Sequence, residues 1–340
     1  MPNPIAAHAR TADGQELPVI DVTHPRFALA DDPAAISALF DAYVEAERRQ
    51  GRVPAFLTRW MMRLAARRSA LLRALLRPNA GFLDGLTTYV MKLGAANLPP
   101  PFDSEIDRRL AAAPHTLALR LRLQQTAKLI ADGLARDLIA APGMPLHLFN
   151  IAGGPAIDSL NALILLRCAD ADILARPITI QVLDLEAQGP LFGANALHAL
   201  SAEGGALAGV EVAFSHESYD WNRPETLDAL VRQAAARGAV IAASSEGGLF
   251  EYGSDQAIVA NLRALHAGGR GAPRRGLRHP CRCDPAAKHR RLRLQAGAAR
   301  DRGLRTPRRS RRIPCGSRRN DAPQRSAGAA ADLNAGSLTS

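Results

Sequence analysis

The stretch Leu146-His147-Leu148-Phe149-Asn150-Ile151-Ala152-Gly153-Gly154-Pro155 decides the fold of this chain. Its first six residues are mainly apolar, which suits one short buried β-strand. The two glycines and the proline then end the strand in a tight turn. A helix-like pattern of apolar residues follows from Asp158 to Arg167. We therefore interpret the stretch as the start of a strand–turn–helix unit.

The same kind of unit recurs three more times along the chain. The further strand-like runs and the helical patterns that follow them are 178–184 with about 191–200, 210–214 with 224–237, and 239–243 with about 255–266. Strands that alternate with helices at this spacing predict an α/β fold, in which a doubly wound parallel sheet carries helices on both faces. This is a Rossmann-like arrangement.

Three domains are expected, with boundaries at changes of pattern. Residues 1–140 are predicted to form a helical domain, with helices from Pro33, over about 55–76 and over about 116–139, and to act as a lid or as the contact of a homodimer. The arginine-rich helix at 55–76 also leaves a membrane-surface role open. Residues 141–268 form the α/β domain, and 269–340 form a basic tail.

Four turns in the α/β domain are candidates for the functional site. In open parallel sheets, the ligand lies beyond the carboxyl ends of the strands. The turns after the four strands are 150–158, Asp184-Leu185-Glu186, Ser215-His216-Glu217 and Ser244-Ser245-Glu246. Paired glycines admit close backbone approach, and an acidic residue after the second strand can accept both ribose hydroxyls of an adenosine.

On these residues, the segment from about Pro145 to His266 resembles the class I S-adenosylmethionine-dependent methyltransferases of the small-molecule type. The first turn in that family reads acidic-x-Gly-x-Gly-x-Gly. In this chain Asn150 stands at the acidic position, Gly154 at the middle glycine, and Ala152 and Ala156 at the outer glycines. The resemblance implies S-adenosylmethionine as the cofactor.

The resemblance also implies which residues contact that cofactor. Asp184 matches the ribose-binding acid of the family, the third turn matches the adenine-contacting region, and the fourth matches the region beside the methyl group. The cofactor-binding candidates are Asn150, Ala152, Gly153, Gly154, Pro155, Asp184, Leu185, Glu217 and Ser244.

His216 and Glu246 are the candidate catalytic residues. A histidine with an ordinary pKa near 6.5 suits removal of a proton from an acceptor oxygen or nitrogen. The cluster of Tyr219, Trp221, Phe250 and Tyr252 is interpreted as an acceptor pocket. The fourth turn lacks the Asn/Asp-Pro-Pro-aromatic pattern of enzymes that methylate base amino groups, which favours a small-molecule acceptor.

Two other functions fit parts of the pattern. An NAD(P)-dependent oxidoreductase uses the same fold but needs Gly-x-Gly-x-x-Gly, and Ile157 occupies its third glycine position. Asp184 also lies 30 residues after Gly154, beyond the spacing of about 20 in that motif. A non-catalytic role, either with an empty first turn or through nucleic acid bound by the tail, is the second alternative.

The net charge of +11 comes entirely from the tail. Residues 269–340 hold 19 Lys and Arg against 4 Asp and Glu, and residues 1–268 carry a net charge of −4. The body therefore gives no sign of a polyanion partner, and neither nucleic acid nor a membrane is the expected partner. Of the four cysteines, only Cys168 lies before the tail, no metal-site spacing occurs, and no secretory signal starts the chain. A cytoplasmic enzyme is expected.

The tail from Gly269 to Arg325 has no apolar period, and its arginines often come in pairs. One interpretation is a disordered basic arm that binds RNA, DNA or acidic lipid. The other, which we favour, is a shifted reading frame, because GC-rich codons read out of frame yield Arg, Ala, Pro and Gly. The completing strands would then be missing, leaving an exposed sheet edge, poor solubility and impaired activity.

The shifted-frame hypothesis predicts the nucleotide sequence. We expect the frame one base forward, between the codons for Ala264 and Asn334, to encode strand-like segments and then a stop codon near Leu333. Sequencing the gene and translating all three frames tests this. Early stop codons in that frame would establish the basic arm as genuine.

Overall fold

The computed structural model describes residues 7–30, 32–50, 64–76 and 85–268. These residues belong to one compact unit, which runs from Met1 to Arg275. The tail, and with it the predicted disorder, lies outside the described residues.

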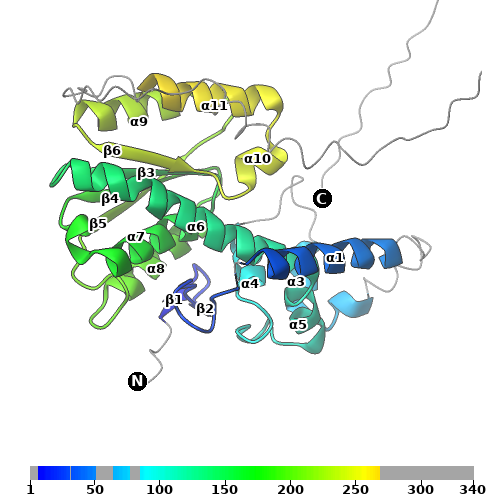
Figure 1. Cartoon of the computed structure of the whole chain (residues 1–340). Helices are drawn as coiled ribbons and strands as arrows, with labels where there is room; N and C mark the ends of the chain where they lie inside the picture. Colours follow the sequence, from blue (N-terminus) through cyan, green and yellow to red (C-terminus); the bar gives the residue numbers. More distant parts are fainter. Residues whose placement is uncertain (1–6, 31, 51–63, 77–84, 269–340) are drawn as a thin grey trace, which may run out of the picture. The chain divides into compact units, whose positions relative to one another are not determined.

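The elements before the sheet include a small antiparallel hairpin that the sequence analysis did not predict (Figure 1). In chain order they are β1 (His8–Arg10), β2 (Glu16–Pro18), α1 (Pro33–Gln50), α3 (Ala70–Leu75), α4 (Gly85–Lys92), α5 (Glu105–Ala111) and α6 (Pro114–Ala140). Asp32 caps α1, because its Oδ1 accepts hydrogen bonds from the backbone N–H groups of Ala34 and Ala35.

The helix predicted over about 55–76 is interrupted in its second half, because residues 64–66 and 70–75 are helical but residues 67–69 are not. Residues 51–63 lie outside the described residues. The chain leaves the helical conformation before Ser69, whose hydroxyl caps α3 by accepting from the Leu72 N–H. The same hydroxyl also donates to the buried carboxylate of Asp107. A serine with two such partners begins a new helix, because its side chain competes for the backbone donors.

The α/β segment contains four parallel strands and the helices between them. Its elements are β3 (Leu146–Ile151), α7 (Ile157–Ala169), the 3₁₀-helix η1 (Ala171–Leu174), β4 (Ile178–Asp184), α8 (Gln188–Ser201), β5 (Val212–Ser218), α9 (Glu225–Ala236), β6 (Val240–Ser244), α10 (Gly248–Tyr252) and α11 (Asp255–Gly268). The prediction of an α/β fold with a parallel sheet is confirmed.

The strand order is β5-β4-β3-β6. Helices α7 and α8 lie on one face of the sheet and α9 and α11 on the other (Figure 1). The order reverses at β3, because the chain first builds outward through β4 and β5 and then returns to place β6 on the other side. Such a reversal opens a crevice at the carboxyl ends of the strands.

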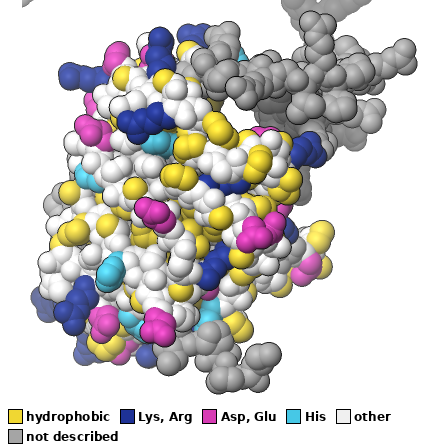
Figure 2. All heavy atoms as spheres, turned by 90° about the vertical axis from the view of Figure 1, so that its left-hand side faces the viewer, with side chains coloured by type: hydrophobic (Ala, Val, Ile, Leu, Met, Phe, Trp, Pro, Cys, Tyr) yellow, Lys and Arg dark blue, Asp and Glu magenta, His cyan; other side chains and the backbone are white. Residues whose placement is uncertain are grey.

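The surface of the described residues is mixed in charge on the face that Figure 2 shows. Basic and acidic side chains are interspersed there among apolar ones. None of the described helices is both long and apolar enough to cross a membrane.

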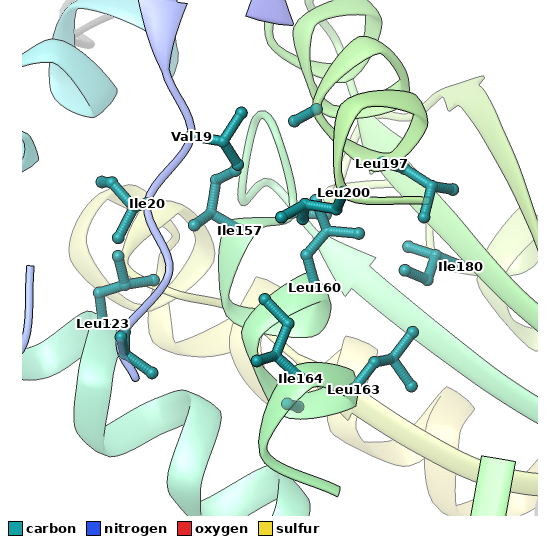
Figure 3. Packing of buried hydrophobic residues seen from close by; sticks show 14 of the residues in the cluster. Val19, Ile20, Leu123, Ile157, Leu160, Leu163, Ile164, Ile180, Leu197 and Leu200 are labelled. Atoms are coloured by element: carbon teal, nitrogen blue, oxygen red, sulfur yellow. The ribbon is translucent and has the colours of Figure 1, made fainter. Parts of the chain in front are cut away.

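The main hydrophobic core joins the N-terminal segment to the sheet. Val19 and Ile20, which follow β2, pack with Leu123 of α6 and with the apolar side chains of α7 (Figure 3). On its other side, α7 packs against β4 and α8 through Leu163 and its neighbours. Because α7 lies between these layers, nine of its 13 residues are buried.

Two buried polar side chains fix the segment after β2. The Tyr89 hydroxyl donates to the Pro18 carbonyl at 2.6 Å and accepts from the Ile20 N–H at 3.0 Å. Asn161 of α7 accepts from the Val22 N–H at 2.8 Å and donates to the Ile20 carbonyl at 2.9 Å. These bonds satisfy backbone groups that no strand partner reaches.

The turn after β3 is held in an unusual backbone conformation. Ala152, Gly154 and Ala156 all have φ between 51° and 58°, the left-handed region that favours glycine. A Cβ on Gly154 would lie 3.1 Å from the Cα of Gly85 in α4, so this turn packs directly against another backbone. The two alanines carry conformational strain that the surrounding packing must offset.

We predict that Ala152→Gly raises the free energy of unfolding by up to about 1 kcal/mol, because glycine tolerates a positive φ without strain. The matched control is Ala202→Gly at an exposed residue with φ −60°, which should lower it by about 0.4–1 kcal/mol. Urea denaturation of both variants measures the two values. Equal destabilisation by both substitutions would contradict the strain.

Candidate functional site

A pocket of ≈ 300 Å³ lies at the carboxyl ends of the four strands. Its walls are the turns after β3, β4, β5 and β6, together with α10 and the N-terminal helices α4 and α6. The turn after β3 and the turn after β6 meet there, since a Cβ on Gly248 would lie 2.3 Å from the Ala152 carbonyl oxygen. The pocket therefore occupies the reversal point of the sheet, where ligands of this architecture bind.

Seven of the predicted site residues line this pocket. They are Ala152, Gly153, Gly154, Pro155, Asp184, Leu185 and Glu246. Of the predicted acceptor cluster, Tyr219, Trp221 and Tyr252 line it, whereas Phe250 does not and is 53% exposed.

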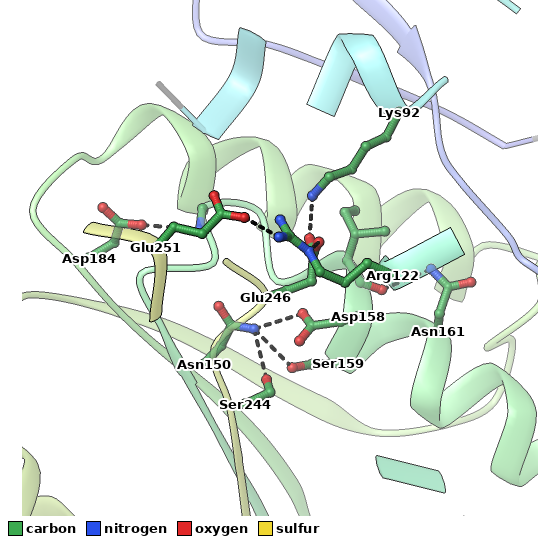
Figure 4. A network of polar contacts seen from close by, with 12 residues as sticks. Lys92, Arg122, Asn150, Asp158, Ser159, Asn161, Asp184, Ser244, Glu246 and Glu251 are labelled. Atoms are coloured by element: carbon green, nitrogen blue, oxygen red, sulfur yellow. Dashed lines mark hydrogen bonds and ion pairs between the residues drawn. The ribbon is translucent and has the colours of Figure 1, made fainter. Parts of the chain in front are cut away.

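Asn150 and Ser244 do not line the pocket but support its floor. The Asn150 side chain is fully buried, and its Nδ2 donates to Asp158 Oδ1 at 2.7 Å and to the hydroxyls of Ser159 and Ser244 at 3.3 and 3.2 Å (Figure 4). A Cβ on Gly153 would lie 2.1 Å from Asn150 Oδ1, so the side chain presses against the underside of the turn. The position that carries an acid in the resembled family is therefore structural here.

His216 and Glu217 lie inside β5 and not in a turn, so the predicted end of this strand is wrong. Pairing with β4 continues to Asp184↔Ser218, which carries the strand beyond the expected end at Phe214. His216 Nε2 lies 2.9 Å from the Asp184 carbonyl oxygen, which can only accept, so Nε2 holds the proton. Neither residue lines the pocket.

Asp184 joins two of the turns that form the pocket. Its Oδ2 accepts from the Gly154 N–H and its Oδ1 accepts from the Glu186 N–H, both at 3.0 Å. A carboxylate offers about four lone-pair positions, so about two remain for a ligand. Asp184 thus holds the two turns in place and retains lone pairs that can accept hydrogen bonds from a ligand in the pocket.

A charge ladder of Lys92, Glu246, Arg122 and Glu251 lines one wall of the pocket (Figure 4). The Glu246 side chain is only 4% exposed and pairs with Lys92 Nζ and, at 3.1 Å, with Arg122 Nε. Arg122 also pairs with Glu251. Burial alone would lower the pKa of Arg122, but Glu251 and Glu246 together raise it above its ordinary value.

The sequence analysis missed Lys92 and Arg122, the two cations of the charge ladder. They lie on α4 and α6, 154 and 124 residues before Glu246. No local pattern marks them, because Lys92 is a single basic residue at the end of α4 and Arg122 is one of several basic residues on α6. Only the packing of α4 and α6 over the sheet brings them to the site.

Asp158 is a second buried acid beneath the pocket. It stands in the first turn of α7, is 1% exposed, and has no hydrogen-bond partner for its Oδ2 among the described residues. Burial, and next the negative charge of Glu246, raise its pKa above the ordinary value of 3.8. Folding therefore favours the protonated carboxyl group more than the unfolded chain does.

Comparisons of the chain with models of known protein families, with curated proteins and with solved structures found no match. Its site must accordingly be interpreted from its own geometry. Among the residues that the structure describes, no three His, Cys, Asp or Glu side chains gather so as to hold a metal ion.

The raised pKa of Asp158 predicts how stability depends on pH. The protonated carboxyl group contributes stability that is fully present below the ordinary pKa of 3.8 and is lost as the pH rises towards the raised folded-state value. We expect Asp158→Asn, which cannot ionise, to gain stability relative to the wild type across that window. Chemical denaturation at a series of pH values measures this difference.

The control for this experiment is Asp132→Asn, at an exposed aspartate of α6. The difference in free energy of unfolding between this variant and the wild type should change little with pH. A constant difference between Asp158→Asn and the wild type at every pH would show that Asp158 ionises in the folded protein as readily as in the unfolded chain.

Proposed function

We propose that the pocket binds S-adenosylmethionine and that the protein transfers its methyl group to an oxygen or nitrogen of a small molecule. The observation that carries the proposal is the turn after β3 at the reversal point of the sheet. The three positions at which the resembled family has glycine all adopt a left-handed conformation, even where two of them are alanine. This conformation supports the alignment of the turn with the family pattern.

The charge of the pocket favours a cationic cofactor over an anionic one. Four carboxylates, Asp184, Glu186, Glu246 and Glu251, face it against two cations, Lys92 and Arg122. When bound, S-adenosylmethionine supplies a positively charged sulfonium as the methyl donor, which suits such a wall. The pyrophosphate of a dinucleotide would meet net repulsion there.

The start of α7 also differs from a dinucleotide site. Such a site has a third glycine at the start of the helix, which lets the helix pack closely on the strand. In this chain Ile157 occupies that position and is buried. The alternative of an NAD(P)-dependent oxidoreductase is therefore the weaker one.

Asp184 and the turn after β3 hold the adenosine part in this proposal. The free lone pairs of Asp184 accept the ribose hydroxyls, and the backbone of Gly153 and Gly154 lies against the ligand. The aromatic side chains of Tyr219, Trp221 and Tyr252 lie on the acceptor side. Their rings orient a small acceptor and exclude water.

A base role for His216 has no support from its position, since it does not line the pocket and its Nε2 faces the Asp184 carbonyl. Glu246 lines the pocket but is held by two cations. We therefore assign Glu246 to binding and assign the enzyme the task of aligning donor and acceptor. Nucleic-acid binding would rest on residues 269–340, outside the described residues.

The proposal predicts that S-adenosylhomocysteine binds and that Asp184→Asn weakens it about 10- to 100-fold, because the lost hydrogen bonds involve a charged acceptor. Isothermal titration calorimetry with the full chain measures both affinities. The control is Asp170→Asn at an exposed aspartate outside the pocket lining, which should bind like the wild type. Tighter binding of NAD than of S-adenosylhomocysteine would favour the oxidoreductase.

A further inference from the structure

Asn150 faces away from the pocket. In the resembled family an acid at this position contacts the methionine part of the cofactor. The Asn150 amide donates to three side chains beneath the turn and is fully buried. A ligand in the pocket therefore cannot reach it, and its ammonium group needs another carboxylate.

The charge ladder supplies that carboxylate in the same pocket. Along this wall, cation and anion alternate in the order Lys92, Glu246, Arg122, Glu251. Ser244 pairs in register with Asn150, and Glu246 follows two residues later, so the carboxylate stands just beyond the end of the strand beside β3. A Cβ on Gly247 would lie 2.5 Å from Arg122 Nη2, which places the guanidinium against the same turn.

The ladder keeps capacity for a ligand while its own ion pairs stay intact. Lys92 has three N–H donors and uses one on Glu246, and Arg122 has five and uses two on Glu246 and Glu251. The Glu246 carboxylate accepts two bonds and retains further lone pairs. An α-amino acid group carries one cation and one anion side by side, which matches the alternation of the ladder.

We propose that the charge ladder is the subsite for a zwitterionic α-amino acid group, with Lys92 and Arg122 binding its carboxylate and Glu246 and Glu251 binding its ammonium. This inference rests on the proposed function, in which that group is the methionine part of the cofactor. In this proposal the subsite lies at the end of β6 and on α4 and α6, whereas the resembled family has an acid for it at the end of the first strand.

The test compares two ligands that differ only in the amino-acid part. 5′-Methylthioadenosine has the nucleoside and thioether of S-adenosylhomocysteine but lacks the zwitterion. We expect the wild-type full chain to bind S-adenosylhomocysteine at least about tenfold more tightly, as one charge-assisted hydrogen bond would give. Isothermal titration calorimetry measures both affinities.

Two variants locate that preference on the ladder. The double variant Lys92→Met with Glu246→Gln removes both charges of the buried pair together, so neither ion is left without its counter-charge. Arg122→Gln changes one partly exposed member of the ladder alone. In both variants, the affinity for S-adenosylhomocysteine should fall to the affinity for 5′-methylthioadenosine. The affinity for 5′-methylthioadenosine should stay within threefold of its wild-type value, on the order of 0.6 kcal/mol. Arg136→Gln, at an exposed arginine of α6, is the control that should keep the preference.

The outcomes separate this inference from the proposed function. If both ligands bind the wild type equally, or if the variants keep the preference, the ladder is not the subsite while cofactor binding stands. Equal loss of both ligands in the variants also overturns the inference, because the ladder would then support the pocket as a whole. If neither ligand binds the wild type, the proposed function fails and the inference fails with it.

Discussion

The buried carboxylate of Glu246 is the constraint on which the site depends. Its side chain is 4% exposed, and removing a carboxylate from water costs several kcal/mol unless counter-charges and hydrogen bonds offset that cost. Both counter-charges come from α4 and α6, far earlier in the sequence. The sheet and the N-terminal helices must therefore dock before Glu246 meets both counter-charges. The pocket lies at the interface between the sheet and the N-terminal helices. This agrees with the finding that both belong to one compact unit, which runs to Arg275.

The turn after β3 depends on the same joint. Gly154 touches Gly85 of α4, and a Cβ on Gly189 of α8 would lie 2.9 Å from the Gly154 Cα. Glycine is thus needed here for close approach of backbones as well as for its positive φ. Asn150 and Asp158 brace the turn from below. The packing on all sides explains how Ala152 and Ala156 remain in a left-handed conformation.

The strands of the sheet could be predicted from sequence because each is a short apolar run between turn residues. β3 and β4 have the predicted bounds. Most of the apolar side chains that predicted them are buried. β5 extends past the prediction because it lies at the edge of the sheet, where alternate residues are exposed and Ser215 to Ser218 look like a turn. The hairpin β1–β2 was missed because two three-residue strands leave almost no periodic signal. Asp184 and the glycine turn were found from local sequence, whereas Lys92 and Arg122 depend on long-range packing that no local pattern contains.

The residues that line the pocket all precede the tail. Within the described residues, β6 has a strand partner only on the side of β3, so the hydrogen-bonding groups of its other edge have no strand partner there. After α11, where further strands of such a sheet are expected, the sequence is rich in arginine and lacks an apolar period. All the pocket-lining residues nevertheless lie between Gly85 and Tyr252. Because the pocket forms at the reversal between β3 and β6, ligand recognition depends on the part of the sheet that is already complete. A shifted reading frame would accordingly affect the stability of the sheet more than the lining of the pocket.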